Sequence, residues 1–149
     1  MQKDIFEVKR ILNNYIDRLI TDYNIKLIYI FGSYAKGTNR ENSDLDIAVY
    51  IKGEPSVFIK LDILDELVEI FSREDIDLVI LNNADVELQF QVIKYGKVIH
   101  MEDLMTKVMF ETRVASNYMD MEHFRNIQHK IGHKRFLEVF GDEGGTSFN

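Results

Sequence analysis

The sequence predicts an α/β (α+β) fold in which helices flank a mixed sheet. Apolar runs of strand length at residues 26–31, 45–51 and 76–81 alternate with longer segments whose apolar residues recur every three or four positions. The chain has 149 residues, of which 46% are hydrophobic, and this suits one domain with a sizeable core. It contains no cysteine, so disulfides and thiolate metal sites are excluded.

Charge and hydropathy narrow the choice of partners and of compartment. The formal net charge is −7, which argues against direct nucleic-acid binding over the whole surface. Residues 1–4 lack the apolar core of a signal peptide, and no apolar run reaches the length of a membrane span. We therefore expect a cytoplasmic protein without a membrane segment, in which any phosphate binding is local and assisted by a metal.

The first elements are a helix and a strand. Residues 4–22 predict one amphipathic helix that ends at Tyr23-Asn24. Its apolar positions share one face: Ile5, Val8, Ile11, Leu12, Tyr15, Ile16, Leu19 and Ile20. The first strand follows, and a Gly32-Ser33 turn and a polar loop connect it to the second strand.

The middle of the chain predicts a helix and a third strand. The only proline, Pro55, lies in the loop that ends the second strand. A helix is predicted over residues 57–72, with a buried face formed by Val57, Leu61, Leu64, Val68 and Phe71. The third strand, residues 76–81, comes next.

Asp85 is the predicted N-cap of a short helix that ends at Tyr95-Gly96, with Val86, Phe90 and Ile93 facing inward. Residues 97–100 then predict a short edge strand. A long helical segment from residue 102 has one face formed by Met105, Val108, Thr112, Ala115 and Met119. We therefore expect a core at residues 1–100, a helical extension at 101–140 packed on the core or on a partner, and a disordered tail at 141–149.

Asp44 and Asp46 open the second strand with one residue between them. Alternate side chains on a strand share a face, so these two carboxylates point the same way, about 6–7 Å apart along the chain. Like charges this close raise each other's pKa unless a cation lies between them, and hard oxygen ligands suit Mg²⁺. Asp77, one acid inside the aliphatic third strand, is either the wet end of that strand or a third ligand beside the first two.

The turn before this pair has the features of an anion site. Gly32 allows a close backbone approach, and Ser33 offers a hydroxyl beside successive N–H groups at a helix start. Lys36 and Arg40 lie in the same loop and could add positive charge toward a triphosphate. A Gly-Ser turn is common by itself, but followed by Asp-x-Asp it predicts a site for a metal–nucleotide complex.

His129 and His133 lie four residues apart and could share a helix face, as metal ligands do. No third ligand lies nearby in the sequence. We interpret them, with His100 and His123, as solvent-facing or interface histidines.

These elements together resemble the polymerase-β-type nucleotidyltransferase superfamily, and within it the minimal nucleotidyltransferase antitoxins that are partners of HEPN-domain toxins. The matching segments are FGSYAKG at 31–37, SDLDIAV at 43–49, IDLVILNNA at 76–84 and VIKYGKVI at 92–99. Lys36 stands where an arginine is more usual, which keeps the charge but loses a bidentate phosphate contact. Residues 101–149 match only loosely.

The resemblance implies a role for each matching residue. Asp44 and Asp46 would hold two Mg²⁺ ions, Asp77 would complete the shell of the catalytic ion and take the proton from the attacking hydroxyl, and Gly32 and Ser33 would bind the β- and γ-phosphates. It implies that ATP is the nucleoside triphosphate, that the product is AMP joined to a tyrosine of a cognate HEPN ribonuclease toxin, and that this modification silences the toxin.

Two other functions remain open from the sequence. One is a small-molecule nucleotidyltransferase of the aminoglycoside-modifying type, although the segment after residue 100 leaves little room for an acceptor-binding domain. The other is a catalytically silent antitoxin that inhibits by binding and occlusion alone. A DNA or poly(A) polymerase is disfavoured because the acidic chain offers no channel for a nucleic-acid strand.

Overall fold

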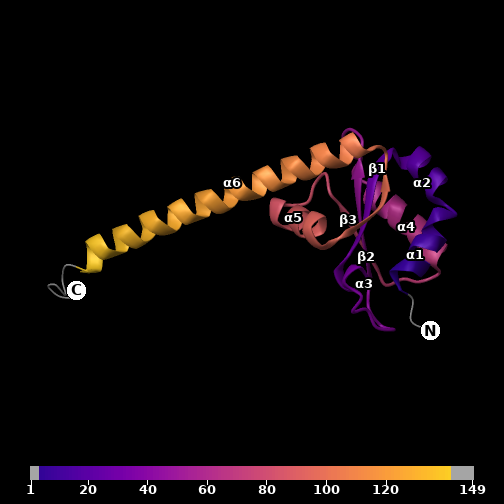
Figure 1. The fold of residues 1–149 in the computed structure, drawn as a ribbon, viewed down its shortest axis with the longest axis horizontal. Coiled ribbons are helices and arrows are strands. Elements are labelled where there is room, and N and C mark those ends of the chain that lie inside the picture. Colours follow the sequence, from indigo (N-terminus) through magenta and orange to yellow (C-terminus); the bar gives the residue numbers. More distant parts are fainter. Residues whose placement is uncertain (1–3, 142–149) are drawn as a thin grey trace. The chain divides into compact units, whose positions relative to one another are not determined.

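The computed structural model describes residues 4–141 as two compact units, of which the first extends to Val114 and the second begins at Ala115 (Figure 1). The first unit contains the sheet and its covering helices. The second contains the later part of the long helix α6 (Leu104–Phe136) and a single π-helical turn, Leu137–Gly141. The predicted tail lies, from residue 142 on, outside the described residues.

A four-stranded mixed sheet forms the centre of the first unit and confirms the predicted fold class. Its strands are β1 (Ile25–Phe31), β2 (Leu45–Ile51), β3 (Ile76–Ile80) and β4 (Lys97–Met101). They lie in the order β3-β2-β1-β4. β1 is antiparallel to both β2 and β4, whereas β2 and β3 are parallel.

Three helices cover one face of the sheet: α1 (Ile5–Asn13), α2 (Ile16–Tyr23) and α4 (Ile59–Phe71). Because alternate strand residues share a face, the side chains that meet these helices recur at every second position. The buried strand residues of this cluster are Ile25, Ile28, Ile30, Leu45, Ile47, Val49, Ile51, Ile76, Leu78 and Ile80.

The opposite face is covered by α5 (Val86–Tyr95) and by the first turns of α6. Phe110 and Val114 of α6 pack with Leu27 and Ala48 of the sheet. The Tyr29 hydroxyl lies 2.7 Å from Glu111 Oε2, to which it donates a hydrogen bond. This face carries the functional residues described below, because Asp46 lies in phase with Ala48.

The predicted helix over residues 4–22 is wrong as a single element, because the chain breaks at Asn14-Tyr15 between α1 and α2. The Asn14 and Tyr15 amides donate to the carbonyls of Ile11 and Leu12, three residues back, so the helical turn tightens and ends. Tyr15 lies outside the helical region with ψ near 0°. Asn24 ends α2 in a left-handed conformation, as the Tyr23-Asn24 boundary predicted.

The predicted inner faces of α4 and α5 are confirmed in part, whereas that of α6 is wrong. Val57 precedes α4 and is 91% exposed, and Leu61 is 60% exposed. The predicted Phe71 is buried and the predicted Leu64 and Val68 pack against the core, but Ile63 and Leu67, which were not predicted, are buried as well. In α6 the buried residues are Phe110 and Val114, whereas the predicted Met105, Val108 and Met119 are exposed. In α5 the fully buried residue is Val92, and the predicted Phe90 and Ile93 are partly buried against the same core cluster. Each helix has apolar residues on more than one side, so periodicity by itself identified the packed side only in part.

No helix within residues 4–141 combines the length and the hydropathy of a membrane span.

Candidate functional site

The site begins where β1 passes directly into the short helix α3 (Gly32–Lys36). Gly32 has a φ of +69°, a conformation that favours glycine. A Cβ atom on this residue would overlap Oδ2 of Asp46. The Asp46 carboxylate therefore lies against the backbone of the turn, and only glycine leaves room for it.

Asp46 and Asp77 are register partners on the parallel strands β2 and β3. Paired residues on neighbouring strands lie about 4.8 Å apart and project from the same face. Asp44 stands two residues before Asp46, just ahead of the strand, and is exposed. Asp77 is also exposed, so its position inside an aliphatic strand carries no burial penalty. Asp46 of β2, Asp77 of β3 and Asp44, just ahead of β2, therefore lie at one end of the sheet.

The position of Asp46 among these acids changes its pKa. The pKa of Asp46 is raised from 3.8 to about 6, first by burial, then by the charge of Asp77 and then by that of Asp44. The raised pKa indicates that the carboxylate is held where negative charge is unfavourable until a cation neutralises it.

The carboxylate oxygens of Asp44, Asp46 and Asp77 are the type of ligand that a hard cation such as Mg²⁺ prefers. Within residues 4–141, no three His, Cys, Asp or Glu side chains lie close enough together to surround an ion. Asp44 and Asp77 still raise the pKa of Asp46, although the three carboxylates are too far apart to surround one ion. The two observations agree because charges interact over longer distances than metal–ligand bonds. Mg²⁺ usually binds through one or two carboxylates and keeps several waters, so Asp46 with either neighbour would suffice.

The remaining predicted site residues, Ser33, Lys36 and Arg40, lie on α3 and on the loop that follows it. Ser33 is the second residue of α3 and is half-buried. Lys36 is exposed, and its Nζ lies 5.6 Å from the centre of the Tyr95 ring at the end of α5. Arg40 is exposed in the loop before β2, where its backbone amide donates to Ser43 Oγ at 2.7 Å. The structure brings Gly32, Asp46 and Asp77 together and leaves Arg40 on the loop.

Arg73 contacts the segments that form the candidate site, although the sequence patterns did not single it out. Its guanidinium donates to the Ser43 carbonyl oxygen at 2.7 Å and to the Tyr34 hydroxyl at 2.7 Å, and it pairs with Asp75. The Asp75 hydrogen bond raises the pKa of Arg73 further, so this group stays charged. Because Ser43 precedes Asp44, Arg73 fixes the backbone that carries the first acid to the end of α3.

The junction of α5 and β4 also adjoins the site. A Cβ atom on Gly96 would overlap the Val92 carbonyl oxygen and would lie 3.2 Å from the Ile30 carbonyl oxygen and 3.4 Å from Phe31 Cβ. The φ of Gly96 is −79°, so glycine is needed here for close packing rather than for an unusual backbone angle. Tyr95 is thereby held beside the end of β1, next to the Gly32 turn.

Asp77 also faces a groove of about 700 Å³ on the outer side of the edge strand β3. Its walls come from the loop before α4, from β3 itself and from the start of α5. The lining residues are Pro55, Ser56, Val57, Ile59, Lys60, Asp77, Leu78, Val79, Ile80, Asn83, Ala84 and Leu88. A polypeptide side chain could approach Asp77 from this side.

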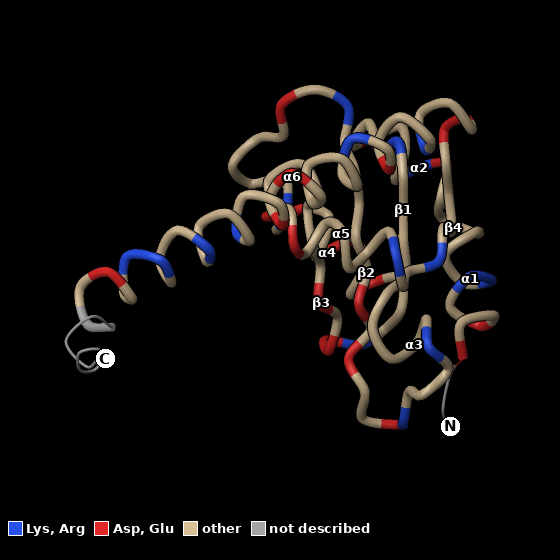
Figure 2. The backbone as a smooth tube through the Cα atoms, turned by 60° about the vertical axis from the view of Figure 1, so that its left-hand side comes forward, with Lys and Arg blue, Asp and Glu red and all other residues tan. Residues whose placement is uncertain are grey.

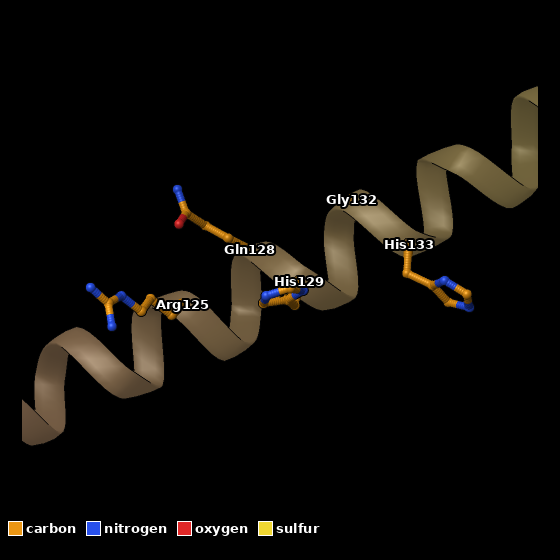
Figure 3. Close-up of a pocket in the computed structure, with 5 residues that line it drawn as sticks. All are labelled: Arg125, Gln128, His129, Gly132 and His133. Carbon is orange, nitrogen blue, oxygen red and sulfur yellow. The ribbon is translucent and has the colours of Figure 1, made fainter.

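A shallow pocket in the second unit is lined by Arg125, Gln128, His129, Gly132 and His133, all on α6 (Figure 3). In Figure 3 the side chains of Arg125 and His133 point to opposite sides of the view rather than toward a common point. No third His, Cys, Asp or Glu ligand accompanies the two histidines in the part of the chain that the structure describes. Basic residues predominate along this end of α6, whereas both signs of charge mix around the sheet (Figure 2).

Residues 13–104 match the family model of polymerase beta nucleotidyltransferases. Protein adenylyltransferase MntA of Shewanella oneidensis is 35% identical over 92 residues, which are 60% of this chain and 66% of that protein, just under two thirds. A Methanocaldococcus jannaschii protein with a provisional adenylyltransferase name is 36% identical over 81 residues, which are 54% of this chain and 93% of that protein.

Solved structures show the same fold. One chain in a crystal structure of a toxin–antitoxin with AMP-PNP is 30% identical, with a TM-score of 0.68 over 80% of this chain and 97% of that chain. A second match is to a complex of tri-AMPylated Shewanella oneidensis HEPN toxin with MNT antitoxin. It has 25% identity and a TM-score of 0.64 over 84% of this chain and 98% of that chain.

Proposed function

Because the chain belongs to the polymerase beta nucleotidyltransferase family, we propose that it transfers AMP from Mg-ATP to a tyrosine of a cognate HEPN toxin and thereby neutralises that toxin. The observation that carries this proposal is the contact of the Asp46 carboxylate with the Gly32 turn, with Asp77 beside it. A turn open to phosphate and a group of acids open to a cation meet at one point, which is what a metal–nucleotide complex requires.

The relatives support the choice of donor and acceptor. The Shewanella oneidensis relative is named a protein adenylyltransferase, and a similar antitoxin chain is found with an AMPylated HEPN toxin. AMP-PNP, present in another similar complex, is an analogue of ATP. ATP is a cytoplasmic metabolite, so we place the proposed reaction in the cytoplasm.

In this proposal the turn and its neighbours bind the nucleotide. Gly32 lets the β- and γ-phosphates approach the backbone amides, and the Ser33 hydroxyl donates a further hydrogen bond. Lys36 adds a positive charge from the same side of α3, since residues three apart share a helix face. Arg40 lies on a loop and would have to turn inward to contribute.

Asp44, Asp46 and Asp77 would hold two Mg²⁺ ions, which when bound neutralise charge on the attacking and leaving oxygens. The tyrosine Oη forms a bond to the α-phosphorus while the bond from that phosphorus to the bridging oxygen of the β-phosphate breaks. Pyrophosphate leaves with the bonding electrons, and the tyrosine proton passes to a carboxylate oxygen of Asp77. The groove on the outer side of β3 gives the tyrosine a route to Asp77.

Intact-mass spectrometry of the HEPN partner tests this function directly. We expect the partner to gain the mass of one or more AMP units after incubation with this protein, Mg²⁺ and ATP. The gain should disappear with the Asp44→Asn, Asp46→Asn double variant. The matched control is Asp62→Asn, Asp65→Asn, which removes two exposed acids of α4 instead.

Other outcomes of the same experiment separate the alternative functions. A tight complex without any mass gain would identify an antitoxin that acts by occlusion. Neither gain nor complex would direct attention to small-molecule acceptors and contradict the protein-directed function.

A further inference from the structure

Two lysines from different elements gather around one exposed aromatic ring. Lys36 Nζ of α3 lies 5.6 Å from the centre of the Tyr95 ring, and Lys94 Nζ of α5 lies 5.2 Å from the same centre. Lys94 also lies 5.8 Å from the Phe90 ring. Tyr95 is 47% exposed, so the cluster of Lys36, Lys94 and Tyr95 is open to a ligand.

The strand register places this cluster beside the acids. Asp77 pairs with Asp46, and Asp46 pairs with Phe31. Ile30 pairs with Lys97 in the antiparallel β1–β4 pair, so Gly96 comes opposite Phe31. These four residues form a row across the end of the sheet, and at about 4.8 Å per strand Gly96 lies roughly 10 Å from Asp46.

The cluster brings like charges together in an acidic protein. Among residues 4–141, neither lysine has a carboxylate oxygen within 4.0 Å of its Nζ, although the chain carries a net charge of −7. The aromatic ring attracts both ammonium groups weakly and is no substitute for an anion. A polyanion that contacts both groups would neutralise this local positive charge.

We propose that Lys36, Lys94 and Tyr95 form the binding site for the terminal phosphates of the nucleotide. Ser33 and Lys36 share a face of α3, so a phosphate chain that starts above Asp46 and passes Ser33 reaches the two ammonium groups at its far end. Lys94 contacts the γ-phosphate and Tyr95 holds both lysines in position. This inference rests on the proposed function, because the ligand is the donor nucleotide of that reaction.

Binding measurements test the site independently of transfer. Isothermal titration calorimetry with Mg²⁺ and AMP-PNP should show that Lys94→Gln weakens binding about tenfold, the size expected for one charge-assisted contact. Binding of AMP, which lacks the terminal phosphates, should not change. Lys9→Gln is the matched control, since Lys9 is an exposed lysine of α1, on the other face of the sheet.

A second pair of variants tests the role of the ring. Tyr95→Phe keeps the aromatic face and should bind AMP-PNP as the wild type does, whereas Tyr95→Leu should bind it severalfold more weakly. Circular dichroism melting verifies that both variants fold. Inorganic tripolyphosphate, which lacks the nucleoside, should compete with AMP-PNP for the wild-type protein and less well for Lys94→Gln.

The outcomes distinguish this site from the proposed function. If Lys94→Gln binds AMP-PNP like the wild type while the wild type still transfers AMP, the site is wrong and the function stands. If Lys94→Gln loses affinity as expected but the wild type transfers nothing, the site stands and the function is wrong. A wild type that binds neither AMP-PNP nor tripolyphosphate overturns the site.

Discussion

Oδ2 of Asp46 occupies the space that a Cβ atom on Gly32 would need. The turn proposed to bind phosphate and the carboxylate proposed to bind Mg²⁺ therefore touch directly. Any side chain at residue 32 would displace the Asp46 carboxylate, so this one contact links the geometry of the two proposed half-sites.

Gly32→Ala should lower the transfer rate about a hundredfold, because a displacement of about 1 Å at a reacting centre has an effect of this size. Gly37→Ala is the control: its φ is +75°, close to that of Gly32, but a Cβ atom added there would have no other atom within 4 Å. Both variants should lose about 1–2 kcal/mol of stability, because both residues have a left-handed backbone conformation that disfavours alanine. Equal transfer rates for the two variants would contradict the importance of the contact.

The stability of the metal-free protein should depend on pH through Asp46. Its folded-state pKa of about 6 exceeds the ordinary value of 3.8, so the native state binds the proton more tightly than the unfolded chain does. The stabilisation is fully present below pH 3.8 and is lost as the pH rises through about 6. Urea denaturation in EDTA should therefore show that Asp46→Asn is more stable than the wild type at pH 7 and that the difference shrinks toward pH 4. Asp62→Asn, which changes an exposed acid of α4, is the matched control.

Arg73→Ala should lower stability by about 1–3 kcal/mol, since it leaves the Ser43 carbonyl and the Tyr34 hydroxyl without their charged donor. Transfer should fall as well, because the backbone before Asp44 loses its anchor. Arg73→Lys keeps the charge but cannot reach all three partners, so we expect an intermediate loss. Arg10→Ala, which removes a surface ion pair with Glu7, serves as the control for thermal melting and should melt nearly like the wild type.

Gly96→Ala should weaken nucleotide binding by pushing the end of α5 away from β1. The added methyl group meets two backbone carbonyls, which cannot rotate aside as a flexible side chain would. The same substitution at Gly132, inside α6, meets no atom within 4 Å and should stabilise that helix by about 1 kcal/mol. Thermal melting and AMP-PNP titration of the two variants should therefore give opposite changes in stability and a loss of affinity only for Gly96→Ala.

Local sequence patterns predicted the strands well. The alternation of side chains on a strand follows from backbone geometry, and it predicts that Asp44 and Asp46 share a face. In the structure Asp46 lies on β2, and Asp44 lies one residue ahead of it. The sequence predicted only that Asp77 lies on a strand next to the one that carries Asp46. The structure shows that β3 pairs with β2 in the register that places Asp77 opposite Asp46.

Contacts between distant segments were not predictable in this way. Arg73 has hydrogen-bond partners 2, 30 and 39 residues away, and nothing in its own segment distinguishes it from a turn arginine. Lys94 acquires its position only when Gly96 packs against Ile30 and Phe31. The face of α4 was predicted only in part for a related reason, since aliphatic residues lie on both sides of that helix and only its packing on the sheet selects Ile63 and Leu67 over Leu61.

Each strand, or the residue just before it, contributes one member to the row formed by Asp77, Asp46, Phe31 and Gly96. Gly96 comes last in the sequence, so it is among the last residues of the sheet to be synthesised. Phe31 and Gly96 meet only when β4 pairs with β1, a pairing between distant parts of the chain. Such pairings form late because the loop between them must close first. We therefore expect the proposed nucleotide turnover to begin only when the whole sheet is complete, so that turnover during synthesis would report the completion of the sheet.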